Sequence, residues 1–266
     1  MTSYAEMRSR AWIALFERRW LWKIIMVSIF FGAANFAQSL AYTMACDWCG
    51  VRTMSDYNFE CKMARINKEP PPPPPTREEM PTFVACSALE YFLTFLFAGL
   101  TCFGGSRATL DAARDEPDRR TLRRSLVCFA QPFGVAWLAF RIWLQVSLWS
   151  LLLIIPGIIA AYRYSCAWQL KCDHPDWSAG KCIAESGRLM AGNKMRAFMF
   201  HMSYWAAILV PIVPLVAAVL AIFVGSLALA GVLVLVFLAL MTFVGCYMGV
   251  GWAVFYDELA RPRRLA

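Results

Sequence analysis

Three charged residues lie inside long apolar stretches of the sequence: Glu90, Arg141 and Arg163. A charge is costly in hydrocarbon, so such residues usually face the interior of a helix bundle and pair with one another. Counting about 1.5 Å of rise per residue, we expect Glu90 and Arg163 at matching depths and Arg141 entering from the opposite face. We predict an intramembrane polar centre. Its role is either structural, as a pair that fixes helix packing, or functional, as a site for an ion, a proton or an anionic head group.

Three cysteines form a second candidate group, in a segment that we expect on the outer side: Cys46, Cys49 and Cys61. Cys46 and Cys49 have the CxxC spacing. In an oxidising compartment a disulfide is favoured, and the odd thiol is left over or pairs with another chain. We therefore predict a disulfide-stapled loop, with metal binding or redox catalysis as the alternative.

The remaining histidines and cysteines give no recognised site. Cys172, Asp173, His174 and Cys182 are near one another in sequence, but their spacing matches no closed zinc pattern. No catalytic triad, HExxH motif, glycine-rich phosphate loop or carboxylate pair is present. The sequence therefore predicts no metal, no cofactor and no catalytic residue.

Composition shows what must position these residues. The chain has 266 residues, of which 59% are hydrophobic and 17% charged, and its mean hydropathy is +0.50. Soluble domains are nearer half apolar and a quarter charged. This indicates a multi-pass membrane protein. A net charge of +8 would suggest nucleic acid as partner for a soluble protein. Here basic loops that orient the chain explain the charge, so we expect no nucleic-acid partner.

The predicted fold class is all-α, a polytopic membrane helix bundle of about six transmembrane helices. The expected spans are residues 21–45, 82–103, 132–155, 158–170, 197–224 and 227–256. Pro156-Gly157 interrupts the apolar run between the third and fourth spans, and we predict an outer-face hairpin turn there. Gly245 and Gly249, four residues apart, are expected to let helix backbones pack closely.

The segments between the spans are polar. The expected parts are a basic helix at 1–20, an outer loop at 46–81, a five-span membrane domain at 82–256 with inner loops at 104–131 and 171–196, and a basic tail at 257–266. The first of these is either an interfacial helix or the charged flank of the first span. Six prolines at 70–75 form a stiff extended spacer, which we favour over a ligand for an aromatic groove.

Charge distribution predicts the orientation. With the N-terminus inside and six spans, the inner segments hold most of the 26 Lys and Arg residues. Basic residues gather on cytoplasmic loops, so the pattern predicts that both termini lie inside.

Four motifs together resemble a known family. They are the run Ile154–Ser165, Asp173-x-Pro175, the segment Ser186–Lys194, and Phe255-Tyr256-x-Glu258-Leu259. In this order they resemble the bacterial integral-membrane family catalogued as domain of unknown function 975, with a more distant likeness to the membrane domain of glycerophosphodiester phosphodiesterases. The resemblance implies six helices in the bacterial cytoplasmic membrane and no established activity. The long outer loop looks like an addition, and Cys166 stands where the family commonly has Met.

We therefore expect a non-enzymatic inner-membrane protein with a role in scaffolding, assembly or lipid association. Its expected partners are the lipid bilayer and either a second copy or another membrane protein. The alternatives are a small transporter or channel that uses Glu90, Arg141 and Arg163, and a membrane enzyme with no recognisable site.

Overall fold

The computed structural model describes residues 3–115 and 121–264, and within these ranges the chain forms helices and no strands. The helices are α1 (Tyr4–Phe16), α2 (Trp20–Cys49), α3 (Met54–Asn67), α4 (Met80–Arg114), α5 (Thr121–Ser125), the 3₁₀ helix η1 (Leu126–Ala130), α6 (Pro132–Leu152), α7 (Ile154–Tyr164), α8 (Ala167–Asp173), α9 (Ala179–Leu189), α10 (Lys194–Met202), α11 (Trp205–Leu209), α12 (Ile212–Phe223) and α13 (Leu227–Arg264).

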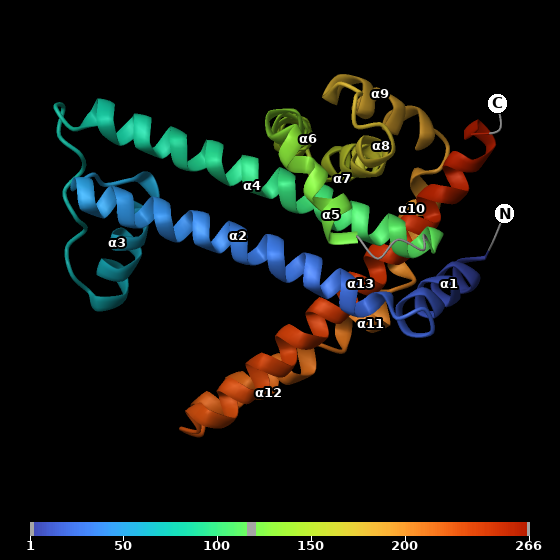
Figure 1. The fold of residues 1–266 in the computed structure, drawn as a ribbon. Helices are drawn as coiled ribbons and strands as arrows, with labels where there is room; N and C mark the ends of the chain where they lie inside the picture. The colour runs from blue at the N-terminus through green and yellow to red at the C-terminus, as the bar shows by residue number, and fades with distance from the viewer. Residues whose placement is uncertain (1–2, 116–120, 265–266) are drawn as a thin grey trace.

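Three helical hairpins extend from a common base (Figure 1). The hairpins are α2 with α4, α6 with α7, and α12 with α13. The first and third diverge as they leave the base, and the second is seen nearly end-on in Figure 1, at a steep angle to the others. Helices α1, α8, α9 and α10 and one end each of α4 and α13 make up the base. The first and third hairpins are therefore joined at the base and separate beyond it, while α6 of the second packs against α4.

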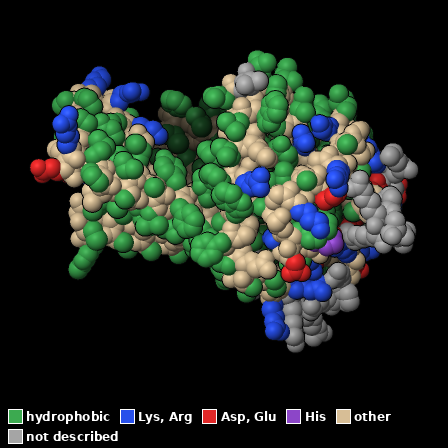
Figure 2. Space-filling model, turned by 90° about the horizontal axis from the view of Figure 1, so that it is seen from above, with side chains coloured by type: hydrophobic (Ala, Val, Ile, Leu, Met, Phe, Trp, Pro, Cys, Tyr) green, Lys and Arg blue, Asp and Glu red, His purple; other side chains and the backbone are tan. Residues whose placement is uncertain are grey.

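Five of the described helices are long and apolar enough to cross a membrane. They are Trp20–Cys49, Met80–Arg114, Pro132–Leu151, Trp205–Phe223 and Leu227–Ala260. At most 22% of the most apolar window in any of them is buried inside the protein. Figure 2 shows apolar side chains over the α2–α4 hairpin, with Lys and Arg at its tip and on the base. Apolar surface between two polar ends is the pattern expected of a chain whose solvent is lipid.

The base has its own apolar core, and this core explains why α4 is longer than the predicted span at 82–103. Ala108, Leu110 and Ala112 on the last turns of α4 are fully buried. Burial of that face stabilises helix where the sequence predicted an inner loop. Helix α1 also contributes to this core, with Met7 and Ala11 fully buried.

The predicted fourth and fifth spans are interrupted. The fourth, at 158–170, is divided between α7 and α8 at Ser165 and Cys166. The fifth, at 197–224, comprises α10, α11 and α12. Pro211 precedes α12 and has no N–H to continue the helix from α11, which ends at Leu209.

The hairpin turn between α6 and α7 lies at Leu153, three residues before the predicted Pro156-Gly157. Leu153 is extended, with φ −164° and ψ 149°. Pro156 falls in the first turn of α7, where a missing N–H costs nothing, because that group has no partner within the helix. The sequence therefore predicted a turn in this region correctly but not its position.

Helix α1 packs against the middle of α13 in the base (Figure 1). The Tyr247 hydroxyl of α13 donates to the Arg8 carbonyl of α1 over 3.4 Å, and the Arg8 guanidinium donates to the Ser203 carbonyl over 2.5 Å. Helices α1 and α13 are thus packed together although they lie at opposite ends of the sequence.

Candidate functional site

A buried ion cluster joins the three hairpins at the base. The Arg114 guanidinium, at the end of α4, donates to both Asp173 carboxylate oxygens over 2.7 and 2.9 Å. It also donates to the Asp257 carboxylate of α13, with the shortest distance 2.8 Å. The Tyr256 hydroxyl adds a 2.9 Å hydrogen bond to Asp173. The side chains of Arg114, Asp173 and Asp257 are between 12% and 16% exposed, so this cluster is largely shielded from water.

Other ion pairs surround the cluster and involve the same helices. Arg196 of α10 lies 3.1 Å from Glu258 of α13. Arg107 of α4 donates to the Cys172 carbonyl of α8 over 3.1 Å and lies 3.2 Å from Asp111. Charge-assisted, two-pronged hydrogen bonds of Arg fix geometry as well as adding energy. The base therefore sets the directions in which the hairpins leave it.

Arg107 and Arg114 lie in the predicted inner loop at 104–131, where the sequence indicates no partner for either. Asp173, Tyr256 and Asp257 lie within or beside the motifs quoted for the family resemblance, yet nothing in their spacing shows that they meet. Arg114 and Asp257 are 143 residues apart. Only the tertiary fold brings them together, so no local pattern predicts the cluster.

The predicted polar centre of Glu90, Arg141 and Arg163 is not assembled. The Arg141 and Arg163 guanidinium groups lie against Gly180 and Gly187, both on α9 in the base. Glu90 belongs to α4, and its Oε2 is buried without a hydrogen-bond partner. Among the described residues none of the three forms an ion pair. The two arginines thus lie beside an amphipathic helix of the base.

The predicted disulfide among Cys46, Cys49 and Cys61 is absent, since all three are free thiols. Cys46 and Cys49 occupy the last turn of α2, and Cys61 lies in α3. The CxxC pair belongs to a continuous helix because α2 extends four residues beyond the predicted span and ends only at Gly50, which is left-handed. The segment at 46–81 is held by other contacts, including the capping box in which Thr53 and Asp56 satisfy the first turn of α3.

Cysteines in the base are structural. Cys172 is 2% exposed, its thiol lies 3.6 Å from the Phe103 carbonyl, and burial raises its pKa. Burial likewise raises the pKa of Cys182. A thiol that stays protonated is a poor nucleophile and a poor metal ligand. The nearby His174 ring stacks on Trp177 at 4.0 Å. Within the described ranges no group of three or more His, Cys, Asp and Glu side chains is placed to hold a metal.

The two glycines of the GxxxG pattern have different surroundings. A side chain at Gly249 would meet the Thr109 methyl at 3.0 Å, so this glycine lets α13 approach α4 closely. A side chain at Gly245 would meet nothing within 4 Å. Gly157, beside the predicted turn, also marks a close approach, because an added Cβ would lie 2.9 Å from the Ser150 Cα. Helices α6 and α7 therefore approach each other closely at Gly157 because this residue has no side chain.

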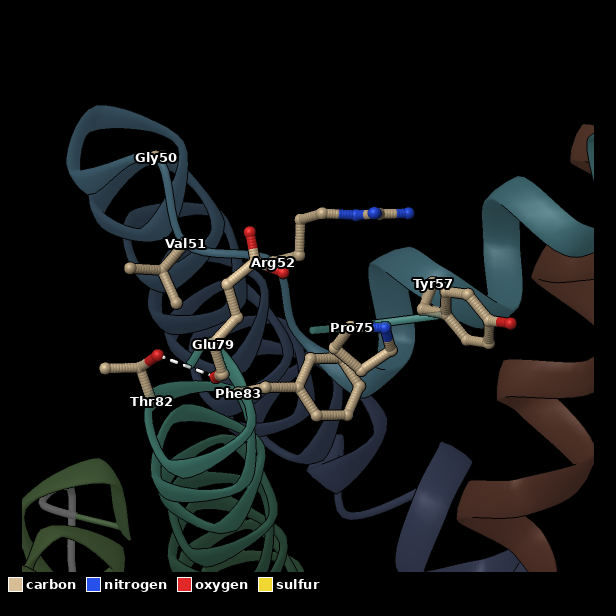
Figure 3. A pocket seen from close by; sticks show the side chains of 8 residues that line it. All are labelled: Gly50, Val51, Arg52, Tyr57, Pro75, Glu79, Thr82 and Phe83. Carbon is tan, nitrogen blue, oxygen red and sulfur yellow. Dashed lines mark hydrogen bonds between the residues drawn. The ribbon is translucent and has the colours of Figure 1, made fainter. Parts of the chain in front are cut away.

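A small pocket at the tip of the α2–α4 hairpin holds the end of the proline segment (Figure 3). The Thr76 N–H donates to the Glu79 carboxylate over 3.0 Å, and the Thr82 hydroxyl donates to the Glu79 carbonyl over 2.8 Å. The Thr76 hydrogen bonds hold the pKa of Glu79 below its ordinary value. The pocket has a volume of only about 80 Å³, space for a few waters, so we assign it a structural role.

A larger groove lies between α4 and α6, and we call it the aromatic groove. Its volume is about 800 Å³. It is lined by Ala88, Tyr91, Phe92, Phe95, Phe133, Gly134, Ala136, Trp137 and Phe140. The Phe92 and Phe133 rings stack across it at 6.5 Å, and Trp137 stacks on Phe140 at 5.5 Å. Small residues give the groove its depth and aromatic residues its walls, which is the lining typical of a site for an apolar ligand.

Comparison with known proteins gives no identity: no family model, no curated protein and no solved structure matches the chain. The resemblance inferred from the four motifs therefore stays a prediction.

Proposed function

We propose that this chain is a non-enzymatic, multi-pass membrane protein that binds a lipid acyl chain in the aromatic groove. The observation that carries the proposal is the groove itself. It holds no charged side chain among its described lining residues, and it lies between two helices that are apolar enough to cross the bilayer. Direct contact between α4 and α6 supports it, because a Cβ added at Gly99 would lie 3.0 Å from the Val135 carbonyl oxygen and both walls of the groove are therefore fixed.

The length of the groove favours a lipid chain over a protein helix. Its lining on α4 extends from Ala88 to Phe95 and on α6 from Phe133 to Phe140. Seven residues of rise correspond to about 10 Å. A transmembrane helix of a partner needs a seam of several turns, with small residues repeated along it. A section of hydrocarbon chain fits a short aromatic groove of this volume.

The proposed topology has six crossings with both termini in the cytoplasm, in a bacterial cytoplasmic membrane. An odd number of crossings would place α1 and the last turns of α13 on opposite sides, whereas α1 packs against α13 at Tyr247 and Asp257 of α13 binds Arg114 in the same base. Residues 154–170, in α7 and the start of α8, supply the sixth crossing back to the base. The basic surface of the base agrees with a cytoplasmic location (Figure 2).

Transport through a charged centre is not favoured, because Glu90, Arg141 and Arg163 form no mutual ion pair in the described chain and the Glu90 Oε2 has no hydrogen-bond partner. Arg141 and Arg163 lie beside α9 of the base, and long basic side chains near helix ends can reach lipid head groups. This placement agrees better with lipid association.

A photo-crosslinking experiment tests the proposal. A photoreactive amino acid replaces Tyr91, which lines the groove, or Val84, which is similarly exposed on the same helix outside it. The protein is purified in detergent, washed free of bulk lipid and irradiated. We expect lipid adducts at position 91 and none at position 84. Equal labelling at both positions, no lipid adduct at 91, or a protein adduct at 91 would overturn the assignment.

A further inference from the structure

A second cavity lies where α2, α4 and α13 meet, under α8 and α10. Its volume is about 530 Å³, and it shares no residue with the aromatic groove. We call it the junction cavity. Its polar lining consists of Ser28, Ser106, Thr109, Gln169, His201 and Thr242. No Asp, Glu, Lys or Arg is among its described lining residues. The lining comes from five separate helices, so the cavity exists only in the folded chain.

Gln169 has an unsatisfied hydrogen-bonding group in this cavity. The side chain is 5% exposed and lines the cavity, and its Oε1 has no hydrogen-bond partner. A buried polar atom without a partner is destabilising. A ligand with a hydrogen-bond donor would remove this cost, which makes Gln169 an independent indication of a binding site.

The other polar groups also offer acceptors. The Thr109 hydroxyl donates to the Ser106 carbonyl over 3.0 Å, and the Thr242 hydroxyl donates to the Leu238 carbonyl over 2.9 Å, so both oxygens keep free lone pairs. The His201 Nδ1 lies 3.2 Å from the Ala197 carbonyl, which leaves Nε2 of the neutral ring as an acceptor. Burial lowers the pKa of His201, so the ring is neutral at neutral pH. The site therefore suits hydroxyl donors and offers no charge to an ionic group.

The shape and the apolar lining of the cavity indicate that its ligand also has an apolar part. Ser28 and Thr242 are exposed at the side of the molecule, where α2 and α13 diverge. Ile24, Met248 and Trp252 form apolar wall. At about 1.5 Å per residue, Ser28 lies about 12 Å along α2 from its start in the base, within the depth of the hydrocarbon. A ligand can therefore enter from the bilayer and leave its chains between the hairpins.

We propose that the junction cavity binds the head group of an uncharged, hydroxyl-bearing lipid, of which diacylglycerol is the smallest example. The head group lies against Gln169 and His201, and its chains extend between the α2–α4 and α12–α13 hairpins. This site is independent of the acyl-chain site in the aromatic groove, and each can fail without the other.

The test measures binding to the full chain in phosphatidylcholine nanodiscs. Three probes are titrated: a short-chain diacylglycerol, the phosphatidic acid with the same chains, and free glycerol. We expect saturable diacylglycerol binding and at least tenfold weaker binding of phosphatidic acid. Free glycerol is expected to compete only weakly, because it has no chains. If glycerol binds as tightly as the lipid, the ligand of the cavity is a soluble polyol and the proposal of a lipid ligand is overturned.

Two substitutions locate the site, each with a matched control. Gly245→Leu adds a side chain that fills the cavity from α13, at a position where the added Cβ has no neighbour within 4 Å. Its control is Gly231→Leu, which adds the same side chain to α13 outside the cavity, at a position where the Cβ also has no neighbour within 4 Å. Gln169→Leu removes the amide, and Gln145→Leu removes another buried amide with an unpartnered Oε1 outside the cavity. We expect at least tenfold weaker binding for Gly245→Leu and Gln169→Leu and unchanged binding for the controls. Binding that is unaffected in both cavity variants, or lost equally in the controls, would overturn the proposal.

Discussion

Arg114 and Asp173 form a two-pronged ion pair, with N–O distances of 2.7 and 2.9 Å, between the end of the α4 helix and the end of α8. The same guanidinium also binds Asp257 near the end of α13. One arginine thus ties together the ends of α4 and α8 and the last part of α13. Helix α4 also packs directly against α6, so the cluster and this contact together fix how the hairpins are arranged.

Removing the arginine should destabilise the protein strongly. Arg114→Met leaves Asp173 and Asp257 largely buried without their cation, and loss of one partner of a buried ion pair costs about 3–5 kcal/mol. Thermal unfolding in detergent measures the effect. The control is Arg10→Gln, whose pair with Glu6 is 40–50% exposed and is expected to contribute at most about 1 kcal/mol. Similar destabilisation by both changes would contradict the role given to the cluster.

The close approach of α6 and α7 gives a second prediction. Gly157→Val would force side-chain atoms into the Ser150 backbone, since even the Cβ would lie 2.9 Å from the Ser150 Cα. Overpacking of this kind costs typically about 1–3 kcal/mol. Gly32→Ala, on a helix surface with no neighbour within 4 Å, should be neutral or stabilising. The midpoint of thermal unfolding distinguishes them, and a neutral Gly157→Val would show that the hairpin is not closed at this glycine.

The long apolar runs predicted the membrane-spanning helices because each run determines its own helix. The length of α4, the breaks at Ser165 and Pro211 and the place of Arg114 depend on packing between distant segments. The junction cavity also depends on packing between distant segments. Gly245 of α13 leaves space in the cavity, whereas Gly249, one turn away, packs on α4. Identical residues in one motif thus have different roles that spacing does not reveal.

Acid should loosen the end of the proline segment. The pKa of Glu79 is lowered from 4.5, chiefly by the hydrogen bond from the Thr76 N–H, so the folded state favours the carboxylate. A lowered pKa means that the stabilisation is present above pH 4.5 and is lost as the pH falls through the folded-state value. Amide exchange at Thr76 should therefore accelerate in acid. Glu79→Gln should remove this pH dependence, and an unchanged profile would contradict the contact.

Thiol labelling tests the fate of the outer cysteines and the orientation together. Cys49 is exposed and free at the end of α2, whereas Cys172 is buried in the base. A membrane-impermeant maleimide added to intact cells should label Cys49 without prior reduction and should not label Cys172. Labelling of Cys49 only after reduction would show that Cys49 forms the predicted disulfide in the cell. Failure to label it in intact cells, with labelling after lysis, would reverse the proposed orientation.

Retention of lipid by the aromatic groove tests the central claim most directly. Native mass spectrometry counts the lipids that remain on the detergent-purified protein, for the wild type, for Ala88→Trp in the groove and for Ala85→Trp on the same exposed helix outside it. We predict that the wild type and Ala85→Trp keep one lipid more than Ala88→Trp. Equal lipid counts for all three proteins would contradict an acyl-chain site between α4 and α6.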